Sequence, residues 1–188
     1  MATLFGPSAL ATPANAVTIG RLVCAPALWL LIVVVGPSYF TLAAWIVLAA
    51  TDGVDGYLAR RHGTTRSGAF LDPLADKALV LGAMWALVAT GLFWWLPVVL
   101  ISAREVTISA FRSYWGRRGL AVPATGWAKV KTVVQAVAVG LALLPPVADR
   151  ALWLASSVLW LAAALTLLTG AQYLVGGSRA TVAGGART

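Results

Sequence analysis

This chain of 188 residues has very little charge for its length. Charged side chains make up 11% of it, whereas hydrophobic side chains make up 60%. Soluble domains carry roughly 25% charged residues, so the composition excludes an ordinary soluble domain and indicates a single membrane domain. The net charge of +8 is divided among apolar runs rather than gathered on one face. We therefore expect no nucleic-acid partner.

Cysteine and histidine are also scarce, with one of each. The single Cys24 lies in an apolar run and cannot form a disulfide within the chain. Zinc prefers His and Cys ligands, so this scarcity argues against a zinc site. The first sixteen residues contain no basic residue, and we expect no signal peptide.

Long apolar runs are what the chain has in place of charge. Hydropathy predicts six spans, each near the ~20 residues that a bilayer requires. They cover roughly Asn15–Val35, Tyr39–Arg60, Gly68–Thr90, Trp94–Tyr114, Trp127–Leu144 and Ala151–Val175. We expect an all-α integral membrane protein with one membrane domain over residues 1–176. A flexible cytoplasmic tail over residues 177–188 is expected to follow it.

The distribution of Lys and Arg predicts the orientation of these spans. With the N-terminus in the cytoplasm, the outer loops keep only Arg150, and the inner loops and tail receive Arg60, Arg61, Arg66, Arg117, Arg118, Arg179 and Arg187. Positive residues are enriched on the cytoplasmic side of membrane proteins. We therefore expect a multi-pass protein of the cell membrane with both termini cytoplasmic.

Four of the six acidic residues form one cluster around a short polar loop. Asp52 and Asp55 are three residues apart, and Asp72 and Asp76 are four apart, so each pair shares one face of a helix. Carboxylates within a membrane are costly, rare and usually functional. Oxygen ligands of this kind suit Mg²⁺ or Mn²⁺. The cluster predicts a site for one divalent cation or a pair of them.

Five cations accompany the carboxylates in or beside the apolar runs: Arg21, Arg104, Arg112, Lys129 and Lys131. Arg and Lys next to a metal site are suited to holding phosphate groups, so we expect these residues to bind the phosphate of a substrate. Two other interpretations stay open. Arg104 and Glu105 could form a salt bridge that holds helices together, and the two lysines could extend toward the inner leaflet.

The carboxylate cluster resembles the signature of the CDP-alcohol phosphotransferase family. It reads Asp52-x-x-Asp55-Gly56-x-x-Ala59-Arg60, then Gly68-x-x-x-Asp72-x-x-x-Asp76. The connection from Arg60 to Gly68 is one residue shorter than usual in that family. Three further segments are similar to bacterial phosphatidylglycerophosphate synthases: Asn15-x-x-Thr18-x-x-Arg21, Arg104-Glu105-x-x-Ile108-Ser109 and Lys129-x-Lys131-Thr132-x-x-Gln135.

The resemblance implies six membrane helices around a polar cavity open to the cytoplasm, in a homodimer. It implies transfer of a phosphatidyl group from CDP-diacylglycerol to glycerol 3-phosphate, with release of CMP. The implied ligands of two Mg²⁺ or Mn²⁺ ions are Asp52, Asp55, Asp72 and Asp76. Asp76 is also the implied general base. The residues implied to lie against the CDP moiety are Gly56, Ala59, Arg60 and Gly68.

Other functions stay open at this point. Within the family, a cardiolipin synthase would use phosphatidylglycerol as its acceptor, and further members would use other alcohols. A cation transporter is an alternative from another class. It would explain carboxylates within the membrane, but not the Gly, Ala and Arg positions of the signature.

Overall fold

The structure is a computed structural model. It describes the backbone of residues 13–62, 66–117 and 127–185, and the side chains of residues 17–51, 75, 77–110 and 130–170. Within these ranges every regular element is a helix, which confirms the predicted all-α class. The helices are α1 Pro13–Val35, α2 Tyr39–His62, α3 Arg66–Ala89, α4 Trp95–Arg117, α5 Trp127–Leu143, α6 Pro145–Arg150 and α7 Leu152–Gly185.

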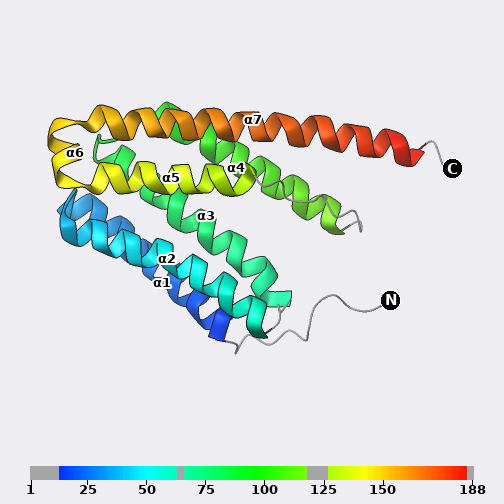
Figure 1. The fold of residues 1–188 in the computed structure, drawn as a ribbon, viewed down its shortest axis with the longest axis horizontal. Coiled ribbons are helices and arrows are strands. Elements are labelled where there is room, and N and C mark those ends of the chain that lie inside the picture. Colours follow the sequence, from blue (N-terminus) through cyan, green and yellow to red (C-terminus); the bar gives the residue numbers. More distant parts are fainter. Residues whose placement is uncertain (1–12, 63–65, 118–126, 186–188) are drawn as a thin grey trace.

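The six long helices form two groups (Figure 1). In one group α1 packs against α2 and α3, and in the other α7 packs against α4 and α5. Contacts of α5 with α2 and α3, and of α3 with α4, join the groups. One end of the bundle holds α6 and the turns after α1 and α3, and we call it the α6 end. The opposite end, which holds the start of α1 and the end of α7, is called the terminal end.

Local sequence explains the turn between α1 and α2. Gly36 has a φ of +73°, a left-handed conformation that suits glycine at the end of a helix, and its N–H donates to the Ile32 carbonyl at 3.1 Å. Pro37 cannot continue the helix. Ser38 then caps α2, because its Oγ accepts from the Thr41 N–H at 3.0 Å. The predicted end of the first span at Val35 is therefore confirmed.

The core near the α6 end is apolar and closely packed. Trp29 of α1 lies against Gly82 of α3, where an added Cβ would overlap the indole ring. Trp45 of α2 is 2% exposed, and its Nε1 donates to the Ala136 carbonyl of α5 at 3.3 Å. Trp45 thereby connects the two helix groups. A small residue such as Gly82 thus allows a large ring to pack directly against the neighbouring helix.

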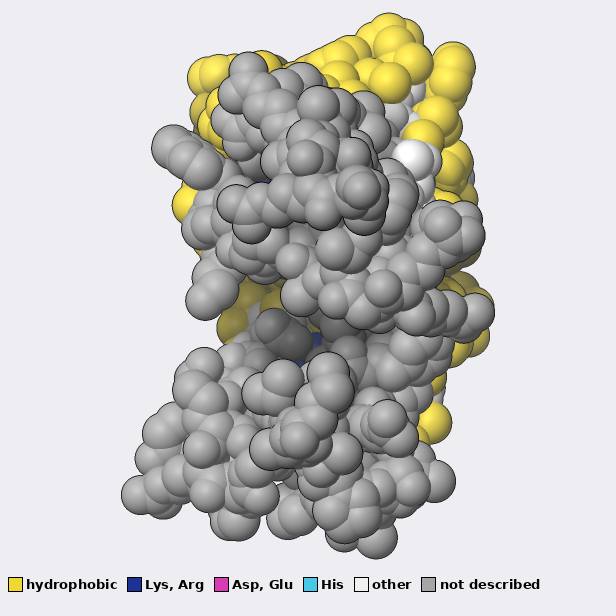
Figure 2. All heavy atoms as spheres, turned by 90° about the vertical axis from the view of Figure 1, so that its right-hand side faces the viewer, with side chains coloured by type: hydrophobic (Ala, Val, Ile, Leu, Met, Phe, Trp, Pro, Cys, Tyr) yellow, Lys and Arg dark blue, Asp and Glu magenta, His cyan; other side chains and the backbone are white. Residues whose placement is uncertain are grey.

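Much of the outer surface is apolar. Val23, Val34 and Phe40 are 70%, 72% and 70% exposed. Two described segments, Val17–Val35 and Leu152–Gly170, are long and apolar enough to cross a membrane, yet only 28% and 33% of these windows is buried inside the protein. Figure 2 views the terminal end, where hydrophobic side chains form the described flanks. Soluble monomers rarely expose so much apolar surface, so the surroundings that fit it are lipid.

The predicted spans agree with the first five long helices to within three residues at each end. Two features differ from expectation. Pro145 and Pro146 begin the short helix α6 within the expected outer loop, because proline is favoured in the first turn of a helix. Helix α7 continues to Gly185, ten residues beyond the end of the predicted sixth span at Val175. No proline interrupts that stretch, and its glycines lower helix propensity by only about 1 kcal/mol each.

Candidate functional site

Buried polar side chains occupy the middle of the bundle and extend toward its terminal end. Those that are 6% exposed or less are Thr18, Arg21, Glu105, Lys131, Gln135, Thr166 and Thr169. They come from α1, α4, α5 and α7. Only Thr41, in the capped turn of α2, is a buried polar residue at the α6 end of the described part. Buried polar groups are costly unless they are paired, so their partners define what this region does.

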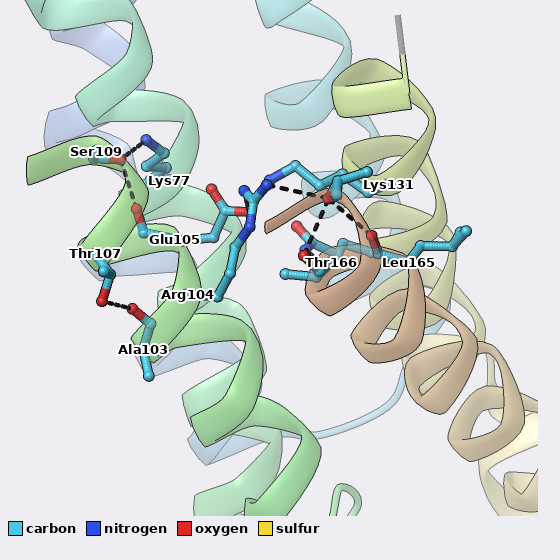
Figure 3. A network of polar contacts seen from close by, with 11 residues as sticks. Lys77, Ala103, Arg104, Glu105, Thr107, Ser109, Lys131, Leu165 and Thr166 are labelled. Atoms are coloured by element: carbon cyan, nitrogen blue, oxygen red, sulfur yellow. Dashed lines mark hydrogen bonds and ion pairs between the residues drawn. The ribbon is translucent and has the colours of Figure 1, made fainter. Parts of the chain in front are cut away.

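Arg104, Glu105 and Lys131 form a buried ion cluster between α4 and α5 (Figure 3). Oε1 of Glu105 accepts from Arg104 Nη1 at 3.1 Å and also from Lys131 Nζ. The three side chains are between 6% and 8% exposed. Among the described side chains, two buried cations therefore share one carboxylate. The Arg104–Glu105 salt bridge, which the sequence left open as an alternative to phosphate binding, is present. Lys131, one of the two lysines predicted to bind phosphate, joins the same carboxylate.

Helix α7 adds a third side to this ion cluster. Arg104 Nη2 donates to Thr169 Oγ1 at 3.1 Å. The Thr169 hydroxyl is itself held by its own helix, with the Leu165 carbonyl at 2.8 Å. Next to it, a Cβ added at Gly170 would lie 3.1 Å from Arg104 Nε and 3.2 Å from Arg104 Cγ. Helix α7 therefore contacts both the guanidinium and the stem of Arg104.

A second polar contact joins α5 to α7, one helical turn after Lys131 on α5. Gln135 Nε2 donates to Thr166 Oγ1 at 3.1 Å, and both residues are buried. Thr166 and Thr169 are three residues apart and share one face of α7. The polar face of α7 thus reaches both α4 and α5.

Lys77 connects α3 to the same region. Its Nζ donates to Ser109 Oγ, and the Ser109 hydroxyl donates to the Glu105 carbonyl at 2.6 Å. Lys77 directly follows Asp76 in sequence. The backbone of the predicted metal segment on α3 is therefore linked through one lysine to the helix that carries the ion cluster.

Arg21 lies on the α2 side of the bundle. It is 2% exposed, and its Nε donates to Thr51 Oγ1 at 3.2 Å. The Thr51 hydroxyl donates to the Leu48 carbonyl at 2.6 Å. Thr51 directly precedes Asp52 in the chain. Arg21 was predicted to bind the same phosphate as Arg104 and Lys131. Its described hydrogen bond places it beside the segment of α2 that carries Asp52 and Asp55, and its role at the phosphate stays a prediction.

The four aspartates lie on the two helices that flank residues 63–65. Asp52 is ten residues before the end of α2, and Asp76 is ten residues after the start of α3. At a rise of 1.5 Å per residue both lie about 15 Å from that connection, and Asp55 and Asp72 lie about 10 Å from it. The two pairs are therefore at matching levels on consecutive helices that contact each other. An all-carboxylate set of this kind fits Mg²⁺ or Mn²⁺.

The side chains of these aspartates are outside the described part, so their role as ligands stays a prediction. Among the side chains that are described, no group of three or more His, Cys, Asp or Glu could hold a metal ion. The remaining predicted residues also have side chains outside the described part: Gly56, Ala59, Arg60, Gly68, Arg112 and Lys129. Their backbone positions are helical, in α2, α3, α4 and α5.

The sequence interpretation missed the contribution of α7. We treated that span as hydrophobic only, whereas Thr166, Thr169 and Gly170 contact α4 and α5 through polar and close contacts. A signal was present. Small and hydroxyl residues on one face of an apolar helix are typical of helix–helix contacts within membranes.

Residues 11–168 match the sequence profile of the CDP-alcohol phosphatidyltransferases. This match covers most of the chain, including the whole aspartate signature and the ion cluster, and it ends just before Thr169. The chain belongs to the CDP-alcohol phosphatidyltransferase family.

Similar proteins carry names of one activity. A Mycobacterium tuberculosis protein named "Probable phosphatidylglycerophosphate synthase" is 42% identical over 147 residues, which cover 74% of this chain and 69% of that protein. The CDP-diacylglycerol–glycerol-3-phosphate 3-phosphatidyltransferase of Escherichia coli K12 is 46% identical over 105 residues, which cover 53% of this chain and 58% of that protein. The Cereibacter sphaeroides protein of the same name is 37% identical over 137 residues, which cover 69% of this chain and 62% of that protein.

Proposed function

We propose that this protein transfers the phosphatidyl group of CDP-diacylglycerol to glycerol 3-phosphate, giving phosphatidylglycerophosphate and CMP. The acceptor's hydroxyl oxygen bonds to the phosphorus that carries diacylglycerol, and the bond from that phosphorus to the CMP oxygen breaks. The names of the similar proteins support this reaction. The observation that carries the choice of acceptor is the buried pair of cations, Arg104 and Lys131, that meet at Glu105.

This ion cluster is suited to an acceptor that brings its own phosphate. Arg and Lys have several N–H donors each, so both cations can bind phosphate oxygens in addition to the Glu105 carboxylate. Charge-assisted hydrogen bonds from Arg and Lys to a phosphate contribute about 1.5–3 kcal/mol each. An acceptor without phosphate would not form these hydrogen bonds. We expect Arg112 and Lys129, on the same two helices, to complete the phosphate site.

The aspartate signature is the proposed donor and metal site. Asp52, Asp55, Asp72 and Asp76 are suited to hold two Mg²⁺ or Mn²⁺ ions, which when bound would neutralise the diphosphate and stabilise charge on the departing CMP. Asp76 is the proposed general base for the acceptor hydroxyl. We propose that the CDP moiety lies along α2 and the start of α3, against Gly56, Ala59, Arg60 and Gly68. Small residues there allow a nucleotide to approach the helix backbone.

The proposed setting is the cell membrane. The exposed apolar surface and the lengths of the six long helices support six crossings around a polar cavity at the terminal end. The distribution of Lys and Arg supports a cytoplasmic position for both termini. A homodimer is proposed from the family resemblance.

An acceptor panel tests the reaction directly. Purified protein in detergent is given CDP-diacylglycerol with glycerol 3-phosphate, glycerol, phosphatidylglycerol or inositol phosphate, and CMP release is measured. We expect glycerol 3-phosphate to be the preferred acceptor, EDTA to abolish turnover, and added Mg²⁺ or Mn²⁺ to restore it. Preference for phosphatidylglycerol would establish a cardiolipin synthase instead. Cation flux in liposomes without CMP release with any acceptor would favour the transporter.

Cysteine labelling tests the orientation. In a Cys24→Ala background, Asp149→Cys on α6 and Ser178→Cys on α7 place one thiol at each end of the bundle. Ser38 also lies at the α6 end, but a cysteine there would remove the side chain that caps α2, so position 149 is used. We expect a membrane-impermeant maleimide to label position 149 in intact cells, and position 178 only after permeabilisation. Labelling of position 178 from outside would reverse the proposed orientation.

A further inference from the structure

We propose that α7 fixes the position of the Arg104 guanidinium, and that Thr169 and Gly170 are positioning residues that tune the acceptor site. The inference rests on the proposed role of Arg104 in binding the acceptor's phosphate. It assigns a function to a helix that the sequence presents only as a hydrophobic span, at two residues that follow directly after the matched family segment.

The geometry holds Arg104 on three sides. Its Nη1 contacts the Glu105 carboxylate at 3.1 Å, and its Nη2 contacts the Thr169 hydroxyl at 3.1 Å. A guanidinium is planar and its N–H groups point in fixed directions, so two partners on different nitrogens determine its orientation. The third side is Gly170, which faces the stem of the side chain. Glu105 is the neighbour of Arg104 on α4, so α7 supplies the contacts from across the helix interface.

Thr169 is a rigid partner because its hydroxyl is anchored to its own helix. Its Oγ1 lies 2.8 Å from the Leu165 carbonyl and 3.0 Å from the Thr166 carbonyl, to which it can donate. The same oxygen accepts from Arg104, so the hydroxyl is both donor and acceptor. Valine has nearly the same shape as threonine but has no hydroxyl. A Thr169→Val substitution therefore removes the hydrogen bond and keeps the packing.

Gly170 leaves room for Arg104 to cross α7. A Cβ at position 170 would lie 3.1 Å from Nε and 3.2 Å from Cγ of Arg104. Nonbonded heavy atoms are normally about 3.5–4.0 Å apart. Even alanine would therefore push the stem of Arg104 by a few tenths of an ångström, and valine would push it further. Glycine is also among the poorest helix formers, so its place in the middle of α7 is best explained by this close approach.

The predicted consequence is selective for the acceptor. Loss of one hydrogen bond that orients a charged group should raise KM for glycerol 3-phosphate about 5- to 10-fold in Thr169→Val. The hydroxyl of Thr169→Ser should restore KM to within about 2-fold of the parent. Gly170→Ala should raise it about 3-fold and Gly170→Val more, because each fills the space that Arg104 occupies. KM for CDP-diacylglycerol should stay within about 2-fold in all of them, since the proposed donor site lies on α2 and α3.

The experiment measures kcat and both KM values for the full-length enzyme in detergent, with Arg104→Ala as reference. Thr107→Val is the matched control. Among its described contacts, the Thr107 hydroxyl donates only to the Ala103 carbonyl of its own helix, at 2.7 Å, and it faces away from α7 (Figure 3). An unchanged acceptor KM in Thr169→Val and Gly170→Ala, together with a raised one in Arg104→Ala, would overturn the positioning role and leave the acceptor site intact. An unchanged acceptor KM in Arg104→Ala would instead overturn the acceptor site itself. If Thr169→Val does not fold, Gly170→Ala decides the question.

Discussion

Near the α6 end, neighbouring helices meet through hydrocarbon and indole rings, whereas toward the terminal end they meet through hydroxyls, cations and a carboxylate. Trp29 against Gly82 is representative of the first half, and Glu105 between Arg104 and Lys131 is representative of the second. The described parts of both halves expose apolar side chains on the outer surface. Among the described side chains, the difference therefore lies in the interior.

This contrast separates stability from function. Apolar burial stabilises the fold, while a buried ion cluster contributes little net stability and is often replaceable by hydrophobic residues without loss. A protein that keeps two cations and one carboxylate inside a membrane bundle is expected to use them. The aspartate signature lies on the terminal side of the same bundle, which places the proposed donor and acceptor sites in one half.

The largest expected effect is the difference in turnover between Asp→Asn substitutions in the two halves. Asp72→Asn, or the same change at Asp52 or Asp55, should lower turnover at least about 100-fold, because metal ions stabilise the transition state by several kcal/mol. Asp149→Asn is the matched control, since Asp149 is exposed on α6 at the other end. Its turnover should stay within about 2-fold of the parent. Mn²⁺ binding that persists unchanged in the triple Asn variant would remove the metal assignment.

The second largest effect is expected at Glu105, which compensates the buried cations. Glu105→Gln keeps the size of the side chain but removes the negative charge that Arg104 and Lys131 share, so the protein should lose about 2 kcal/mol of stability. Thermal unfolding in detergent measures this. Adding Lys131→Met in the Glu105→Gln background should restore part of the loss, because one of the two repelling charges is gone. Equal stability of Glu105→Gln and the parent would mean that the ion cluster is not compensated as described.

The sequence was sufficient to predict the helices of the bundle. Turn residues such as Gly36 and Pro37 and the lengths of apolar runs place five long helices to within three residues. These signals are local, because they depend on backbone conformation and on the length that a bilayer requires. The end of α7 was missed because Gly176 and Gly177 resemble a linker in sequence, although a helix tolerates them at modest cost.

The site was predictable in residue type but only partly in grouping. Arg104 and Lys131 were expected together and are found joined by Glu105. Arg21 was also expected at the phosphate; its described hydrogen bond is to Thr51 of α2, and its phosphate role stays a prediction. Which charged groups meet depends on how helices pack, and spacing within one helix does not contain that information. The role of Thr169 was missed for the same reason, because its partner is 65 residues away.

A smaller effect should distinguish cations at the two ends. Lys131→Ala should raise KM for glycerol 3-phosphate about 10-fold, which corresponds to about 1.4 kcal/mol, with less change in the donor KM. Arg112→Ala is expected to act in the same direction. Arg150→Ala on α6 is the matched control, since Arg150 is exposed at the α6 end and should leave both KM values unchanged. A similar rise in Arg150→Ala would show that net charge, rather than the ion cluster, sets acceptor affinity.

The smallest effect should appear in the apolar half, and it should change stability without changing substrate use. Gly82→Ala adds a Cβ that overlaps the Trp29 indole, and a rigid ring between α1 and α3 can move only by disturbing both helices. We expect a loss of about 1 kcal/mol, from overpacking partly offset by better helix propensity. Gly20→Ala is the matched control on α1, where an added Cβ meets nothing within 4 Å. It should be neutral or slightly stabilising, because only the propensity gain remains. Thermal unfolding and KM for glycerol 3-phosphate are measured on both variants. A selective rise in this KM for Gly82→Ala would mean that the two halves are coupled. The separation of stability from function would then not hold.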